Sequence, residues 1–112
     1  MLQTRENTRT LSLRMTHSPG ITTIGVAGEL DVYTAEDLRS ALKAALELGR
    51  DVSTLRVELR RVTFVDSVGL AVLVGALRQA QEAGIKLELE SPSGAVQRLL
   101  ELSGLARLFQ MR

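Results

Sequence analysis

Residues 55–90 read LRVELRRVTFVDSVGLAVLVGALRQAQEAGIKLELE, and this stretch predicts a strand, a helix and a second strand. Apolar and charged residues alternate at its start, which is the period of a half-buried strand, and the strand continues to Phe64 after a kink at Arg60-Arg61. The next segment, 67–83, is dense in helix-forming residues, and alternation returns over 85–90. Such a unit forms a right-handed crossover that leaves its two strands parallel and its helix lying on the sheet.

The residues before this unit predict two more strands that form a hairpin. Apolar and polar residues alternate over 11–16, as in a half-buried strand. The turn at 17–20 is so short that the next strand, 21–28, can pair with the first only in antiparallel orientation. Because residues 21–28 carry apolar or small side chains on both faces, we expect the second strand near the centre of the sheet.

Two further helices complete the order of elements. Thr34 and Asp37 resemble a capping box at the start of a helix over 35–48. The segment 91–93, Ser-Pro-Ser, offers two possible N-caps for a short helix that ends before Gly104 and whose one face is lined by Val96, Leu99, Leu100 and Ser103. The chain therefore predicts an α/β fold with the order β-β-α-β-α-β-α. Its sheet is mixed, mostly parallel with one antiparallel N-terminal hairpin, and is covered by helices.

Length and composition fit one compact domain. The chain has 112 residues, of which 45% are apolar and only three are aromatic, so its core must consist of aliphatic side chains. Residues 1–10 show no periodicity, and we expect a flexible N-terminal tail there. We expect residues 11–112 to form a single domain.

Charge and composition argue against several classes of partner. The formal charge is +1, and the 14 basic and 13 acidic residues are interspersed, so no surface for nucleic acid is indicated. The chain contains no cysteine, which fits a reducing compartment. It shows no signal peptide and no apolar run long enough for a membrane span. We expect a cytoplasmic protein without nucleic-acid or membrane partners.

Enzymatic chemistry has little support in the sequence. His17 is the only histidine and falls in a turn, so neither a metal centre nor a Ser–His–Asp arrangement is indicated. The nearest approach to a phosphate-binding glycine motif, Gly25–Gly28, falls inside a strand. A small enzyme would need clustered His, Lys or carboxylate side chains in a cleft. We expect no catalytic residue, no metal and no cofactor.

The junction at Asp66-Ser67 is the most informative site. A strand ends there and an apolar helix begins. Either side chain is a good N-cap, and capping alone would explain both the residue types and their position. Gly69 has a structural explanation too, because a glycine allows close approach of helix and strand. These residues alone leave capping and a functional role equally open.

Three motifs resemble the STAS domain of anti-sigma factor antagonists. Residues 65–70, VDSVGL, are similar to the D-S-x-G-L signature of that family. Residues 28–35, GELDVYTA, resemble its G-E-L-D-x-x-T-A segment, and 96–105 resembles its third helix, which ends in S-G-L. The motifs follow in the family's order over about residues 11–109, so the chain is identified as a member of this family.

The resemblance implies a binding protein rather than an enzyme. Members of the family bind an anti-sigma factor, often one with serine kinase activity, and thereby release a sigma factor for transcription. Phosphorylation of the residue after the signature Asp, here Ser67, switches binding off, and a phosphatase acting on phospho-Ser67 restores it. The next residue is Val68 where many members have a second serine, which leaves this chain one acceptor.

Further positions are expected near the same partner surface. Asp31 and Glu29 follow or end the second strand, at the edge of the sheet where the second helix should begin. For each of them a cap or a surface carboxylate is the alternative, and Tyr33 either contacts the partner or covers the first helix. The full set of expected partner-binding residues is Asp66, Ser67, Val68, Gly69, Asp31, Glu29 and Tyr33.

Two other interpretations stay open at this stage. The chain could be a STAS scaffold subunit of a lipid-transport or sensory complex that is not phosphorylated, although the Asp66-Ser67 pair favours the phosphorylated antagonist. An exposed strand edge also leaves weak homodimerisation open.

Overall fold

A computed structural model of the chain describes residues 10–47 and 51–112. The tail expected at residues 1–10 lies outside this range except for Thr10, as does the last residue of the helix expected over 35–48. The strands are β1 (Leu11–Ser18), β2 (Gly20–Leu30), β3 (Val52–Val65), β4 (Lys86–Glu90) and β5 (Gln110–Met111). The helices are α1 (Ala35–Glu47), α2 (Ser67–Ala83), α3 (Gly94–Ser103) and the single 3-10 turn η1 (Ala106–Leu108).

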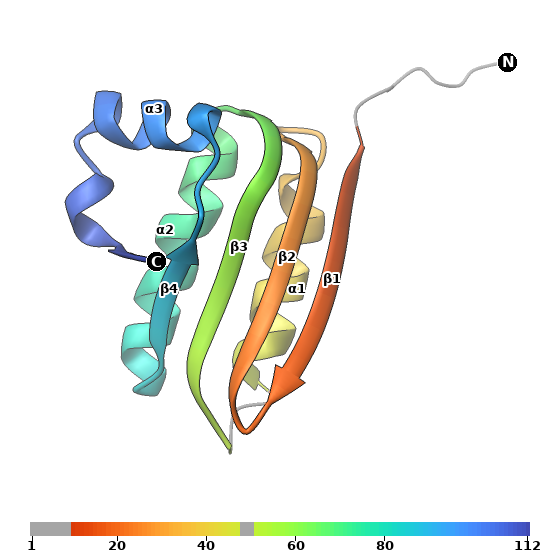
Figure 1. Cartoon of the computed structure of the whole chain (residues 1–112), viewed down its shortest axis with the longest axis vertical. Helices are drawn as coiled ribbons and strands as arrows, with labels where there is room; N and C mark the ends of the chain where they lie inside the picture. Colours follow the sequence, from red (N-terminus) through yellow and green to blue (C-terminus); the bar gives the residue numbers. More distant parts are fainter. Residues whose placement is uncertain (1–9, 48–50) are drawn as a thin grey trace, which may run out of the picture.

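The strands form one mixed sheet in the order β1-β2-β3-β4-β5. β1 and β2 pair antiparallel, and every other neighbouring pair is parallel. Helices α1 and α2 lie side by side on one face of this sheet (Figure 1), while no described element covers the opposite face of β1, β2 and β3. The predicted α/β fold and its element order are therefore confirmed, and η1 and β5 follow as additions at the C-terminal end.

The core lies between the sheet and the two helices. Its buried side chains are aliphatic, as the composition requires, and Phe109 is the only aromatic among them within the described residues. Truncating one such side chain to alanine costs about 2–5 kcal/mol in well-packed cores. The largest fully buried side chains are Ile24, Leu30, Leu38, Leu42, Leu55, Leu59, Leu73, Leu89, Leu100, Val26, Val57 and Val62.

The expected kink at Arg60-Arg61 is confirmed and is a β-bulge. Gly25 of β2 pairs with Glu58, but Ala27 pairs with Arg61, so β3 carries one residue more than β2 over this interval. A bulge of this kind interrupts the alternation of side chains between the two faces. Both arginines are consequently exposed, although neighbours in a regular strand would point to opposite faces.

The C-terminal residues extend the sheet beyond β4. Leu89 pairs with Met111, and the Arg112 amide donates to the Leu89 carbonyl at 2.7 Å. Phe109, just before β5, is only 6% exposed. This short strand was not predicted because two residues are too few to show a period.

Glu88 of β4 forms ion pairs with Arg56 of β3 and with Lys86 of its own strand, on the sheet face opposite α1 and α2. Arg56 Nε lies 3.0 Å from Glu88 Oε1, and Lys86 Nζ lies 3.2 Å from Glu88 Oε2. Burial opposes ionisation of Glu88, but the hydrogen bonds and positive charges of Arg56 and Lys86 outweigh it and hold the pKa of Glu88 below its ordinary value. Ionised Glu88 therefore stabilises the folded protein.

Candidate functional site

Asp66 joins the end of β3 to the start of α2 and caps the helix. Its Oδ1 accepts hydrogen bonds from the amides of Val68 and Gly69, both at 3.0 Å. The Asp66 amide in turn donates to the Leu30 carbonyl at 3.2 Å, at the end of the neighbouring strand β2. Of the two cap residues left open by the sequence, Asp66 is the one that fills this role.

Ser67 is the first residue of α2 and is exposed. Across the described chain, no side chain or backbone group hydrogen-bonds its hydroxyl, because the free helix amides are already satisfied by Asp66. A serine hydroxyl that neither caps nor packs is accessible to another protein. Ser67 therefore has no visible structural duty at this position.

Gly69 sets how closely α2 approaches β2. A Cβ atom added to it would lie 2.6 Å from the Leu30 carbonyl oxygen and 2.6 Å from Leu30 Cγ, which is far inside ordinary contact. Gly69 is buried, so this residue contributes close packing that positions the two residues before it. The surroundings of Gly69 therefore support the explanation that a glycine is needed here for close approach of helix and strand.

Asp31 organises the loop between β2 and α1. Its side chain is only 2% exposed, and Oδ1 accepts from the amides of Tyr33 at 2.9 Å and Thr34 at 3.2 Å. The Thr34 hydroxyl donates to the Glu29 carbonyl at 2.6 Å and accepts from the Asp31 amide at 3.0 Å. These bonds turn back into the loop, whereas the capping box had predicted a bond forward to Asp37. The side chains of Asp31 and Thr34 therefore fix the backbone of the loop that carries Tyr33.

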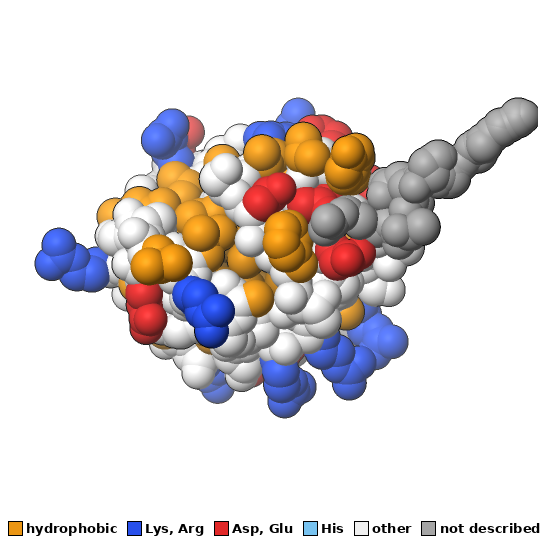
Figure 2. All heavy atoms as spheres, turned by 90° about the horizontal axis from the view of Figure 1, so that it is seen from above, with side chains coloured by type: hydrophobic (Ala, Val, Ile, Leu, Met, Phe, Trp, Pro, Cys, Tyr) orange, Lys and Arg blue, Asp and Glu red, His pale blue; other side chains and the backbone are white. Residues whose placement is uncertain are grey.

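Four exposed apolar side chains lie at the end of the sheet that carries Ser67. Tyr33 is 66% exposed, Val32 59%, Phe64 41% and Val68 38%. They share this end because β2 and β3 are parallel neighbours there, with Glu29 paired to Phe64. Figure 2 looks onto this end and shows apolar side chains across its middle, acidic ones among them, and most Lys and Arg side chains at the periphery. We call these four residues with Ser67 the Ser67 surface.

The structure brings most of the predicted site residues to this one end. Glu29 is half-buried at the end of β2, where its amide donates to the Thr10 carbonyl at 3.0 Å, and Asp66 is half-buried just after the end of β3. Sequence reasoning did not include Val32 and Phe64. Val32 carries a weak signal, an apolar residue in an otherwise polar loop, whereas the exposure of Phe64 depends on a second register shift near Gly28 that alternation does not reveal.

Metal-ligand clusters and membrane-spanning helices are both absent from the described residues. No three His, Cys, Asp or Glu side chains among them gather as metal ligands would. In the same part of the chain, no helix combines the length and the apolar character that crossing a membrane requires. His17 Nδ1 lies 3.1 Å from Thr22 Oγ1 in the hairpin, on β1 rather than at the Ser67 surface.

Comparison with known families gives a match over nearly the whole described domain. The model of the STAS domain family matches residues 12–112. The chain belongs to the STAS domain family. The resemblance deduced from the three motifs, and the STAS-like mixed sheet expected with it, are thereby confirmed.

Individual relatives of this STAS protein agree with the family. An anti-sigma-B factor antagonist of Bacillus subtilis is 40% identical over 73% of this chain and 72% of its own length. The crystal structure of an anti-sigma factor antagonist from Mycobacterium paratuberculosis superposes with a TM-score of 0.77 at 26% identity, covering 91% of this chain and 85% of the other. The phosphorylated form of the Bacillus cell fate determinant SpoIIAA shares the fold, with a TM-score of 0.70 at 24% identity over 90% of this chain and 91% of its own.

Proposed function

We propose that this STAS protein is an anti-sigma factor antagonist that binds an anti-sigma factor through the Ser67 surface and is switched off by phosphorylation of Ser67. The single observation that carries the proposal is the division of roles between Asp66 and Ser67. Asp66 caps α2, and the Ser67 hydroxyl stands exposed without a bond in the described structure. The similarity to anti-sigma-B factor antagonists supports the class of partner.

Binding through this surface follows from its composition. Val32, Tyr33, Phe64 and Val68 expose apolar area that a partner would remove from water, at about 25 cal/mol per Å². Aromatic residues such as Tyr33 often contribute most to an interface. The Asp31 carboxylate accepts from the Tyr33 amide and fixes the backbone at this tyrosine before binding, so less conformational freedom is lost when a partner docks.

Phosphorylation would reverse this binding through charge. A phosphate on Ser67 adds about −1.5 to −2 charges next to Asp66, in the middle of the apolar contact area. Burying that charge against a partner would be opposed by desolvation and by repulsion from carboxylates. Within the protein itself the phosphate sits at the positive end of α2, where a negative charge gains about 0.3–1 kcal/mol.

The proposal includes the enzymes that would set the state of Ser67. The anti-sigma factor would itself carry serine kinase activity, a separate phosphatase would act on phospho-Ser67, and both would meet this protein in the cytoplasm, where transcription takes place. The protein would then be substrate and ligand, with no catalytic residue of its own. The second candidate is a STAS scaffold in a larger complex. Every observation that fits the scaffold fits the antagonist equally well.

The test is phosphorylation by the cognate anti-sigma factor kinase with ATP, followed by intact mass and a binding assay. Wild type should gain one phosphate and lose affinity for the anti-sigma factor by at least about tenfold. Ser67→Ala should gain none, while the matched control Ser40→Ala, an exposed serine on α1, should behave as wild type. Modification at another residue, or undiminished binding of the phosphorylated form, would refute the switch.

A further inference from the structure

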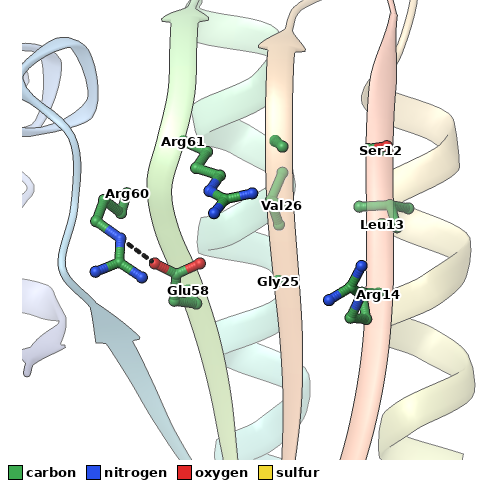
Figure 3. A pocket seen from close by; sticks show the side chains of 9 residues that line it. Ser12, Leu13, Arg14, Gly25, Val26, Glu58, Arg60 and Arg61 are labelled. Atoms are coloured by element: carbon green, nitrogen blue, oxygen red, sulfur yellow. Dashed lines mark ion pairs between the residues drawn. The ribbon is translucent and has the colours of Figure 1, made fainter.

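The open face of the sheet carries a groove that the Ser67 surface does not include. Its volume is about 330 Å³, and it lies across β1, β2 and β3 (Figure 3). That is the lower end of the range for small-molecule sites, about 300–1,000 Å³. The residues that shape it are Ser12, Arg14, Gly25, Ala27, Arg60 and Arg61.

The groove is hollow at its centre because the side chains at its floor are small. Gly25 and Ala27 of β2 lie between longer side chains on the two neighbouring strands, and Ser12 of β1 pairs with Ala27. A Cβ atom added to Gly25 would meet only the Arg14 carbonyl and Glu58 Oε1, both at 3.9 Å. The space above Gly25 is therefore open.

Arginines from both neighbouring strands form the walls. Arg14 pairs with Gly25 from the β1 side, and its guanidinium points toward β2, as does that of Arg61 from the β3 side (Figure 3). The bulge in β3 is the reason that Arg60 and Arg61 both border this face. Two guanidinium groups thus approach the same floor from opposite sides.

The charges of the groove are not balanced within it. Glu58 is the one carboxylate that lines the groove. Its Oε2 lies 3.3 Å from Arg60 Nε, so the negative charge of Glu58 is balanced by Arg60. Neither Arg14 nor Arg61 forms an ion pair or side-chain hydrogen bond with any described residue. Three arginines and one glutamate leave two net positive charges above the glycine.

From this arrangement we infer that the groove binds a small organic phosphate, with the phosphate group held between Arg14 and Arg61. Guanidinium groups recognise phosphate oxygens with paired, charge-assisted hydrogen bonds, and two of them match a doubly charged phosphate monoester. A phosphate group fills only part of a 330 Å³ groove, so the organic portion would lie along Gly25 and Ala27. The site is independent of Ser67 and of any kinase.

The test is a titration of the full-length protein, labelled with ¹⁵N, with ribose 5-phosphate and separately with inorganic phosphate at low ionic strength. The backbone amides of Gly25 and Ala27 and the side-chain signals of Arg14 and Arg61 report on the groove. Ribose 5-phosphate should shift these signals in a saturable manner and bind more tightly than inorganic phosphate.

Three variants and one control separate the site from general attraction of anions. Arg14→Gln and Arg61→Gln should each weaken binding by about tenfold or more. Gly25→Val keeps every arginine and has room for its Cβ, yet it fills the floor and should also abolish binding. Arg78→Gln, which removes an exposed charge from α2, should leave the affinity unchanged.

Several outcomes would overturn the inference. Linear shifts spread over all basic residues, or equal losses in Arg78→Gln, would reveal adventitious anion binding only. If inorganic phosphate binds as tightly as ribose 5-phosphate, the organic part of the ligand contributes nothing to binding, and the inference of an organic phosphate is wrong. Absence of binding to ribose 5-phosphate, together with shifts of the groove signals on addition of the anti-sigma factor, would reassign the groove to a protein interface.

Discussion

Replacing Gly69 with alanine tests how the start of α2 is positioned. The added Cβ would lie 2.6 Å from the Leu30 carbonyl oxygen, whereas ordinary contacts begin at 3.4 Å, so helix and strand must separate by about 0.8 Å. Overpacking of this kind costs about 1–3 kcal/mol. The separation also strains the bond from the Asp66 amide to the Leu30 carbonyl, worth about 0.5–1.5 kcal/mol. Helix propensity returns at most about 1 kcal/mol.

The expected result is a loss of about 1–3 kcal/mol in the free energy of unfolding, measured by urea denaturation followed by circular dichroism. Gly75 supplies the matched control, because it lies in the same helix and a Cβ there would meet nothing within 4 Å. Gly75→Ala should therefore raise stability by about 0.5–1 kcal/mol. If both substitutions change stability in the same direction, α2 does not pack on Leu30 as closely as described, and the positioning argument for Ser67 fails with it.

Three further predictions concern the cap, the ion pairs and the Ser67 surface. Asp66→Ala should lower the free energy of unfolding by about 1 kcal/mol, and Asp66→Asn, which keeps the accepting oxygen, by clearly less; equal losses would count against the cap. Glu88→Gln should destabilise the protein at neutral pH by about 1–3 kcal/mol, because a largely buried arginine loses its carboxylate. Since the pKa of Glu88 is lowered by folding, wild type should lose this advantage as the pH falls below the ordinary pKa of glutamate and through the lowered pKa of the folded state, so the two unfolding curves should converge in acid; a constant difference would contradict the lowered pKa. Tyr33→Ala and Phe64→Ala should each weaken binding of the anti-sigma factor by about tenfold with little effect on folding, whereas Leu102→Ala, which truncates an exposed leucine of α3, should not; equal effects of all three in calorimetric titrations would place the interface elsewhere.

Periodicity predicted most of the fold because most elements bury one face. The strand over 55–64 and the helix over 67–83 are long enough for their periods to stand out, and even the bulge at Arg60-Arg61 is visible as a broken alternation. Of the two N-cap serines that the sequence offered for α3, Ser93 is the one used, and its hydroxyl accepts from the Val96 amide at 3.3 Å. β5 forms because it pairs with β4, and a tertiary contact of this kind cannot be predicted from the pattern of two residues.

The candidate site was predictable in its position but not in its division of roles. That Asp66 and Ser67 lie at a helix start follows from the sequence, yet either could cap it, and only the geometry assigns the bonds to Asp66. Asp31 was expected at the surface, since an aspartate after a strand is usually exposed. It is buried because two backbone amides of its own loop, those of Tyr33 and Thr34, converge on one carboxylate oxygen, an arrangement that depends on the path of the backbone.

Because Asp66 and not Ser67 caps α2, the proposed phosphorylation of Ser67 would change the surface without changing the fold. If Ser67 supplied the cap, a phosphate on its oxygen would replace the acceptor of the helix amides, and modification would disturb the start of α2. Here Asp66 accepts both amide bonds, and Gly69 holds the helix against Leu30 from the buried side. A phosphate added to the Ser67 oxygen would leave the bonds of Asp66 and the packing of Gly69 intact. The new charge would then lie among exposed apolar side chains, where it would oppose association through the cost of its desolvation.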